Sequence, residues 1–222
     1  MDVAAAHELL VRLAGRLPDD VLWRLRDWVA ADAAAPVGAL LPRALLRNRV
    51  GLTDGERSLL AAAAGDSRLV DAVLPLSVDT PVPAFTPGPE LPDPALMGAM
   101  AVVAGHPGVE ELRDSRRGPQ RVLIVSGADR PWALTGTLQR LLRVHGDRTP
   151  CVEVLPAETE LAKSTMGTGT ELAKSTMGTG TELAESTGRR GFEPPAYHQA
   201  AIVGSRPVWT APTRPRVLSP TS

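Results

Sequence analysis

Cysteine is almost absent from this sequence, which has a single one, Cys151, among its 222 residues. One cysteine cannot form an intrachain disulfide, and it cannot build a multi-cysteine zinc or iron–sulfur site. The composition therefore excludes disulfide-rich secreted scaffolds and zinc ribbons, and it favours a cytoplasmic protein. We expect neither a metal ion nor a cofactor.

Long apolar runs are missing as well. The uncharged window of residues 95–109 is 15 residues long and contains Gly98, Gly105 and Pro107, whereas a membrane span needs roughly 20 apolar residues. The N-terminus carries Asp2 and Glu8 where a signal peptide has Lys or Arg. We predict a helix there, and no membrane association.

Motifs of known chemistry are not found. The sequence contains no GxGxxG, GxxxxGK[ST], HExxH or GxSxG pattern and no paired Cys/His spacing. Four histidines are scattered over separate segments: His7, His106, His145 and His198. These absences lower the expectation of a nucleotide-dependent enzyme, a metallopeptidase or an α/β-hydrolase, and we interpret the chain as leaning away from catalysis.

Lysine is rare, with two residues against 22 arginines, although the net charge is only −1. Arginine, alanine, glycine and proline have GC-rich codons, so we infer a GC-rich bacterial source. Arg43, Arg47 and Arg49 form one basic cluster, on an expected helix, and Arg189 and Arg190 form another. Clusters this small are more typical of a solvated face than of a nucleic-acid-binding surface.

Residues 1–74 are predicted to form a helical module. Helical spacing of apolar residues recurs three times along it, in Leu9–Leu13, Val21–Val29 and Leu40–Leu46. Thr53-Asp54-Gly55-Glu56 matches a capping box, in which Thr53 caps a helix and Glu56 reaches back to it. We expect four or five short helices.

Residues 75–94 contain seven prolines and have a net charge of −3. Proline lacks an amide hydrogen and restricts the residue before it, so we predict an extended linker. For residues 95–117 the pattern fits helix and strand equally well, since Met97–Ala104 is apolar throughout.

A small α/β domain is predicted from residues 95–158 and 189–210. Arg121–Gly127 and Cys151–Leu155 are short apolar runs typical of buried strands, and Pro131–His145 between them has helical spacing. Strand, helix and strand in this length indicate a βαβ unit with parallel strands. Ala200–Val203 is predicted as a third strand. The fold class is thus α+β or α/β, in two modules.

An 11-residue repeat, TELAKSTMGTG, starts at Thr159, recurs identically from Thr170 and ends in a shorter copy. Its glycines disfavour a continuous helix, and its units are too small for a solenoid. We interpret residues 159–188 as a flexible insertion in the second domain, with a functional or a packed repeat as alternatives. Residues 211–222 are predicted to be a disordered tail.

One position in the expected architecture suggests a ligand site. In open α/β sheets ligands bind outside the carboxyl ends of the strands, where this chain has Ser126, Gly127, Asp129 and Arg130. Gly127 would permit close backbone approach and Arg130 could pair with an anion at the next helix N-terminus. The alternative is an ordinary turn. Cys151 is expected to be a buried apolar residue.

The absence of a catalytic constellation, together with two modules joined by a linker, favours a non-catalytic regulatory or adaptor protein with a protein partner. One alternative is an α/β domain, either an enzyme or a binding module, that binds a small ligand or nucleotide at Ser126–Arg130. A second is a nucleic-acid-binding protein using the Arg43–Arg49 helix.

Overall fold

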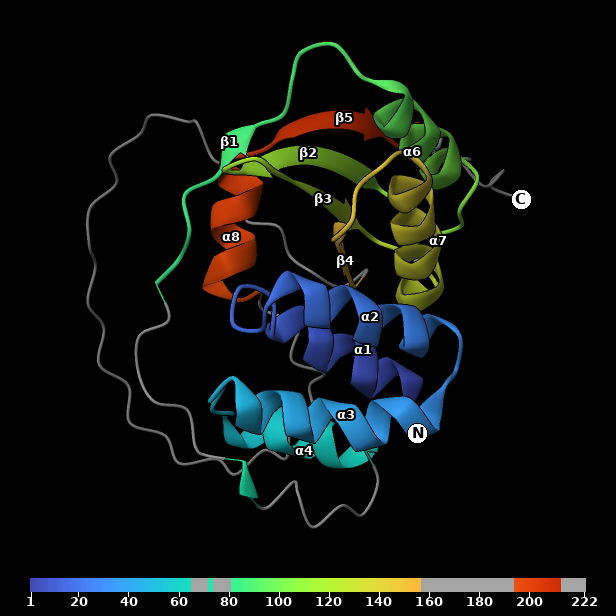
Figure 1. Cartoon of the computed structure of the whole chain (residues 1–222). Coiled ribbons are helices and arrows are strands. Elements are labelled where there is room, and N and C mark those ends of the chain that lie inside the picture. Colours follow the sequence, from blue (N-terminus) through green and yellow to red (C-terminus); the bar gives the residue numbers. More distant parts are fainter. Residues whose placement is uncertain (65–71, 74–80, 157–193, 213–222) are drawn as a thin grey trace, which may run out of the picture.

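The computed structural model describes residues 1–64, 72–73, 81–156 and 194–212. Four helices form one group, and a five-stranded mixed sheet with three further helices lies beside it (Figure 1). The fold therefore belongs to the α+β class, one of the two expected. None of the helices within these residues combines the length and the apolar character that crossing a membrane requires.

The N-terminal helices are α1 (Val3–Arg12), α2 (Asp19–Ala30), α3 (Ala34–Arg47) and α4 (Asp54–Ala64). The predicted capping box of α4 is confirmed: the Thr53 hydroxyl accepts from the Glu56 amide, and the Glu56 carboxylate accepts from the Thr53 amide at 2.9 Å. The helices bury a leucine-rich core between them, which includes Leu9, Leu25 and Leu41. The helical spacing of apolar residues in the sequence is therefore enough to predict this group of helices.

The sheet contains β1 (Thr86–Pro87), β2 (Glu111–Arg117), β3 (Gln120–Ser126), β4 (Cys151–Leu155) and β5 (Arg206–Thr210). Its order is β1-β2-β3-β4, and β5 pairs with β2 on the same side as β1. β2 and β3 form an antiparallel hairpin, whereas β3 and β4 are parallel. The predicted βαβ unit is confirmed, with α7 (Pro131–Val144) as its helix.

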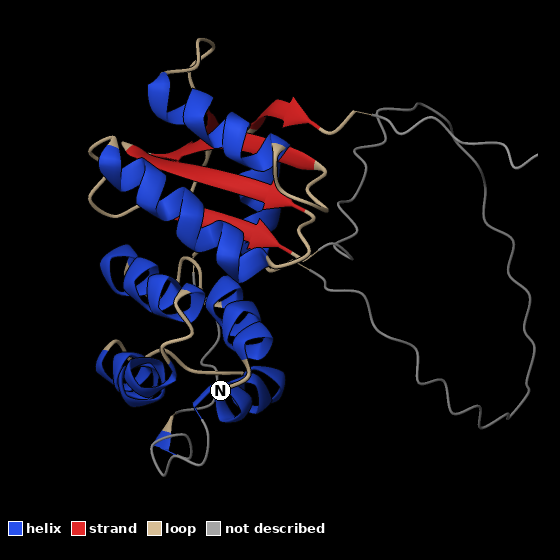
Figure 2. Ribbon diagram, turned by 90° about the vertical axis from the view of Figure 1, so that its right-hand side faces the viewer, coloured by secondary structure: helices blue, strands red, loops and turns tan. Residues whose placement is uncertain are grey.

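The sheet has helices on both faces. α6 (Pro94–Ala104) and α7 cover one face, as the turned view shows (Figure 2), and α8 (Ala196–Val203) packs on the other. Strands β3 and β4 are buried on both faces, which explains why they read as continuous apolar runs. The undecided residues 95–117 supply one of each element, α6 and then β2.

The expectation of a strand at Ala200–Val203 is wrong, because these residues form the second half of α8. Pro195 sets the start of this helix, and Tyr197, His198 and Ala201 are buried at helical spacing. The strand of this region comes later, at β5. Four apolar residues in succession carry no period, so the sequence could not separate the two structures.

The N-terminal helices pack against the β4 side of the sheet. α2 contacts α7 and β4, and α1 contacts β4 as well (Figure 1). Gly15, in the turn after α1, has φ +77° and lies against the ring of Tyr197 on α8, where a Cβ would be 2.5 Å from the ring. The two predicted modules thus share packed surfaces.

The proposed domain boundaries stay a prediction. The described part of the expected linker, residues 81–94, contains β1 and the first residue of α6. The whole repeat, residues 159–188, and residues 213–222 of the predicted tail lie outside the described residues.

Candidate functional site

The four residues predicted as a ligand site lie together at the end of β3. Ser126 is buried, and its hydroxyl has no hydrogen-bond partner among the described residues, while Asp129 and Arg130 are exposed. Gly127 has φ +71°, and a Cβ there would lie 2.2 Å from the carbonyl oxygen of Gly108. The lack of a side chain at Gly127 therefore allows the backbone of Gly108 to approach closely.

Little space is open beside this turn. The hollow next to Ser126 is lined by Glu111, Arg113, Ile124 and Ile202, and it is too narrow to admit a water molecule. A ligand at Ser126 would first have to displace these side chains. The assignment of a ligand site here stays a prediction.

A different cluster of polar groups lies in the interior, where α2 and α8 meet β4. Glu153 projects from β4, and both of its oxygens accept hydrogen bonds from the Arg26 guanidinium of α2, at 2.8 and 2.6 Å. His198 Nε2 of α8 lies 3.0 Å from Glu153 Oε2. All three side chains are buried, with exposed fractions of 2% or less.

The electrostatics of this cluster keep Glu153 ionised. Burial alone would raise the pKa of the carboxyl, but the charge of Arg26 and the hydrogen bond with His198 outweigh it and lower the pKa to about 2. Burial likewise disfavours the charged form of Arg26, and the Glu153 carboxylate more than compensates, so the pKa of Arg26 is raised. The pair is a buried salt bridge between the helices and the sheet.

Two side chains of this junction also bind the free edge of β4. Arg26 donates to the Val152 carbonyl at 2.9 Å, and His7 Nε2 of α1 donates to the Val154 carbonyl at 2.9 Å. Burial lowers the pKa of His7 to about 4, so its ring is neutral at physiological pH. The edge carbonyls of β4 are thereby satisfied without another strand.

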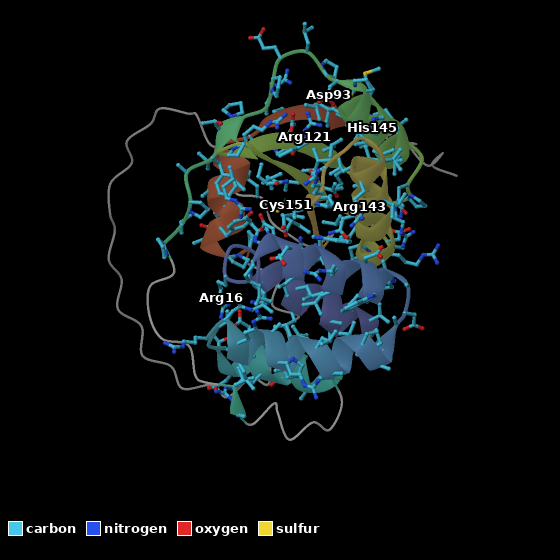
Figure 3. All side chains as sticks on the ribbon, in the orientation of Figure 1. Arg16, Asp93, Arg121, Arg143, His145 and Cys151 are labelled. Carbon is cyan, nitrogen blue, oxygen red and sulfur yellow. The ribbon has the colours of Figure 1, made fainter. Side chains whose placement is uncertain are left out.

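Cys151 lies beside this network, in the interior of the molecule (Figure 3). Its sulfur is 3.9 Å from the Tyr197 hydroxyl and 3.9 Å from Glu153 Oε1. Burial, and then the nearby carboxylates of Glu153 and Asp19, raise the pKa of the thiol to about 12. A neutral, enclosed thiol is a poor nucleophile, and this arrangement suits packing.

The histidines do not converge on a metal site. His145 is exposed at the C-terminal end of α7 (Figure 3), and His106 is in the loop after α6, whereas His7 and His198 are buried at the junction. No group of three or more His, Cys, Asp or Glu residues in the described part of the chain has a metal-binding arrangement.

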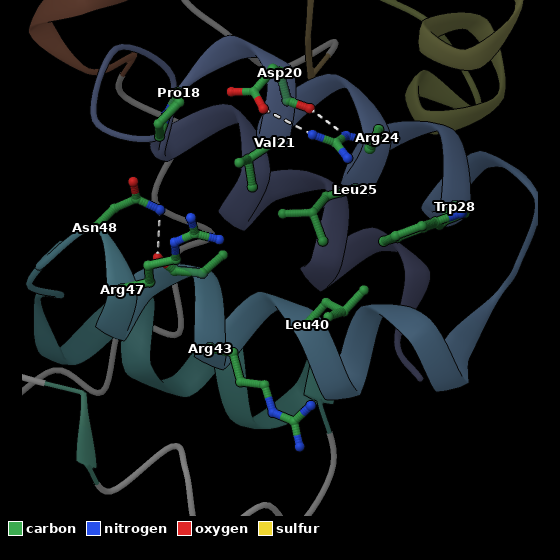
Figure 4. Close-up of a pocket in the computed structure, with 11 residues that line it drawn as sticks. Pro18, Asp20, Val21, Arg24, Leu25, Trp28, Leu40, Arg43, Arg47 and Asn48 are labelled. Atoms are coloured by element: carbon green, nitrogen blue, oxygen red, sulfur yellow. Dashed lines mark hydrogen bonds and ion pairs between the residues drawn. The ribbon is translucent and has the colours of Figure 1, made fainter.

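A groove with a volume of about 370 Å³ lies between α2 and α3 (Figure 4). We call it the α2–α3 groove. Five of its lining residues are apolar side chains of the two helices: Val21, Leu25, Trp28, Leu40 and Ala44. Leu40 is 40% exposed, although most leucines of these helices are fully buried. Leu25 is buried, and Val21, Trp28 and Ala44 are half-buried. A partly uncovered apolar surface of this kind is typical of an interaction site.

Arginines flank this apolar surface on both helices. Arg24 of α2 forms an ion pair with Asp20 at 2.8 Å, one helical turn away. Arg43 and Arg47 of α3 are exposed and four residues apart, and no ion pair engages either of them within the described residues (Figure 4). Arg49, which the sequence grouped with them, lies beyond the end of α3 with φ +53°.

Sequence reasoning missed Arg26, Glu153 and the groove, but it had signals for the first two. Arg26 interrupts the apolar stripe of Leu22, Leu25 and Val29, and Glu153 interrupts the apolar run of β4. A charge at a buried position needs a partner of opposite sign, so the two interruptions could have been paired. The groove depends on how two helices pack against each other, which no local sequence pattern predicts.

Comparison with known proteins gives no relative: no family model, no curated protein and no solved structure matches this chain. The function must therefore be argued from the geometry.

Proposed function

We propose that the protein is a non-catalytic regulatory or adaptor protein, and that it binds a partner protein through the α2–α3 groove. The observation that carries the proposal is the separation between reactive groups and accessible surface. Glu153, His198 and Cys151 are enclosed in the interior, whereas the groove is lined by apolar side chains, arginines, Asp20 and Asn48.

This separation disfavours chemistry at either place. A general acid, base or nucleophile has to reach its substrate within hydrogen-bond distance, and the side chains of the interior cluster are at most 2% exposed. The groove holds no histidine, cysteine or serine. Apolar surface flanked by arginine is instead the composition enriched in protein interfaces.

The test is site-specific photo-crosslinking in living cells, so that the natural partner is present. The cells are those of the source organism or of a close relative with similar codon usage. A p-benzoylphenylalanine replaces Leu40 in the full-length protein, and the same residue replaces Thr137, exposed on α7, as the matched control. We expect a discrete adduct from position 40 that position 137 does not give. Identical adducts from both positions, or none from either, would overturn the proposal.

A thermal-shift screen with nucleotides and phosphorylated metabolites separates this function from the ligand-binding alternative. A ligand present at about 100 times its Kd stabilises the native state by about 2.7 kcal/mol. We expect no such stabilisation from any member of the screen. A shift that Arg130→Ala removes would place the function at Ser126–Arg130 instead.

A further inference from the structure

We infer that the partner segment that enters the α2–α3 groove is an acidic amphipathic helix. This inference rests on the proposed function and adds the chemistry of the partner. It follows from three properties of the groove: its walls are helices, the charge along it is positive, and its floor consists of apolar side chains.

The walls are two helices, which determines the backbone that fits between them. The groove follows α3 from Leu40 to Asn48, about 12 Å at 1.5 Å per residue. Neither wall offers the unpaired backbone groups that an extended peptide needs for strand addition, whereas a third helix can pack its ridges between the two. The available length matches about two turns of a helix, with two or three apolar side chains facing the floor.

The charge along the groove is positive. The lining residues include Arg24, Arg43 and Arg47 against a single carboxylate, Asp20. Asp20 is paired with Arg24, and within the described residues no ion pair engages Arg43 or Arg47. Their two guanidinium groups can therefore pair with an occupant. Figure 4 shows Arg47 directed toward the space between the helices and Arg43 on the outer side of α3. A partner with Asp or Glu beside its apolar side chains satisfies both, and a basic partner would be repelled.

The floor argues against a nucleic acid as the occupant. A phosphate backbone pairing with Arg43 and Arg47 would leave the exposed part of Leu40 and the half-buried Val21 uncovered and gain nothing from them. Single-stranded nucleic acids also need several aromatic platforms for stacking, and the groove has one, Trp28. The combination of apolar floor and cationic rim is the chemistry of helix-in-groove recognition of an acidic helix.

The experiment measures binding of fluorescein-labelled peptides to the full-length protein by fluorescence anisotropy. The probe has about 15 residues, long enough for a marginally stable helix, with leucines at i, i+3, i+4 and i+7 and glutamates on the flanks. Two comparison probes are the same peptide with lysine in place of glutamate, and a single-stranded DNA oligonucleotide. We expect the acidic peptide to bind at least about tenfold more tightly than the basic one, which is ~1.4 kcal/mol.

Two variants test which residues bind the probe. The double variant R43E/R47E reverses two exposed charges, and we expect it to weaken the acidic peptide at least about tenfold, or ~1.4 kcal/mol. The matched control R130E/R148E makes the same change in net charge at exposed positions outside the groove, and affinity should stay within about twofold. Leu40→Glu should weaken binding as strongly as the first variant, because it places a charge on the apolar floor.

The outcomes separate this inference from the proposed function. Equal binding of acidic and basic peptides, or an unchanged affinity in R43E/R47E or Leu40→Glu, would overturn the acidic-helix inference. DNA binding that exceeds peptide binding and is lost in R43E/R47E would assign the groove to nucleic acid. If position 40 still gives a discrete crosslinked partner whose yield R43E/R47E does not change, the adaptor function stands and only the charge preference is wrong.

Discussion

At the scale of single residues, the buried Arg26–Glu153 pair joins α2 to β4. Two charges taken out of water gain little net stability over an apolar pair of the same size, because desolvation offsets their attraction. Removing one partner is a different matter, since the other is then left as an unpaired charge inside the protein. The arrangement therefore specifies how the helices dock on β4 more than it adds stability.

Glu153→Gln tests this reasoning. The amide keeps the size and some hydrogen bonding of the side chain but leaves Arg26 as an uncompensated buried charge, so the free energy of unfolding should fall by about 3–5 kcal/mol. The double variant Arg26→Met/Glu153→Leu should lose less than Glu153→Gln does. Urea unfolding near neutral pH measures both losses.

Glu8→Gln is the matched control for this prediction. Glu8 also pairs with an arginine, Arg12 at 2.8 Å, but its side chain is 35% exposed, so its loss should cost less than about 1 kcal/mol. If Glu153→Gln were no more destabilising than Glu8→Gln, then Arg26 and Glu153 would not form a pair of opposite charges in the interior.

At the scale of elements, the start of α4 is held by reciprocal side-chain bonds. Thr53→Ala removes the hydroxyl that accepts from the Glu56 amide, and we expect a loss of about 1 kcal/mol in the free energy of unfolding. Ser58→Ala in the same helix removes an exposed hydroxyl that bonds to the Asp54 carbonyl one turn earlier, and it should change stability by less than about 0.5 kcal/mol. Equal effects of the two substitutions in thermal or urea unfolding would contradict the role of the box.

Elements of this kind could be predicted because their signals are local. The capping box lies within four residues, and the stripe of α2 and the apolar runs of β3 and β4 are each read within about a dozen. The strand prediction for Ala200–Val203 was wrong because four apolar residues in succession suit a helix and a strand equally. Pro195 and contacts with the sheet, whose strands are distant in sequence, favour the helix. The groove could not be predicted for a similar reason. It is formed by α2 and α3 together, and neither helix alone has a sequence pattern that indicates it.

At the scale of the whole molecule, the edges of the sheet are protected by distant parts of the chain. The outer strand β5 contains Pro207, which has no amide to donate to a further strand. The opposite edge, β4, is covered by α1 and α2, whose His7 and Arg26 side chains bind its carbonyls. The N-terminal helices and the sheet are consequently expected to unfold together, because exposing β4 would leave these groups unpaired.

This coupling makes the stability of the whole chain depend on the protonation of His7. Its pKa is about 4 in the folded protein, against the usual 6.5. Above pH 6.5 the ring is neutral in both states and contributes no pH dependence. As the pH falls from 6.5 to about 4 the unfolded chain takes up a proton that the folded chain does not, so the free energy of unfolding falls, by up to about 3 kcal/mol.

His7→Gln isolates this effect, because glutamine can still donate to the Val154 carbonyl but does not titrate. Burial raises the pKa values of Asp19 and Asp114, and their protonation as the pH falls acts in the opposite direction. The difference between the two proteins therefore measures His7, and the slope of either one alone does not. Urea unfolding followed by tryptophan fluorescence at about pH 7 and about pH 4.5 should show a larger loss for the wild type. If the two proteins lose the same amount, the imidazole is not the neutral donor that joins α1 to the edge of β4.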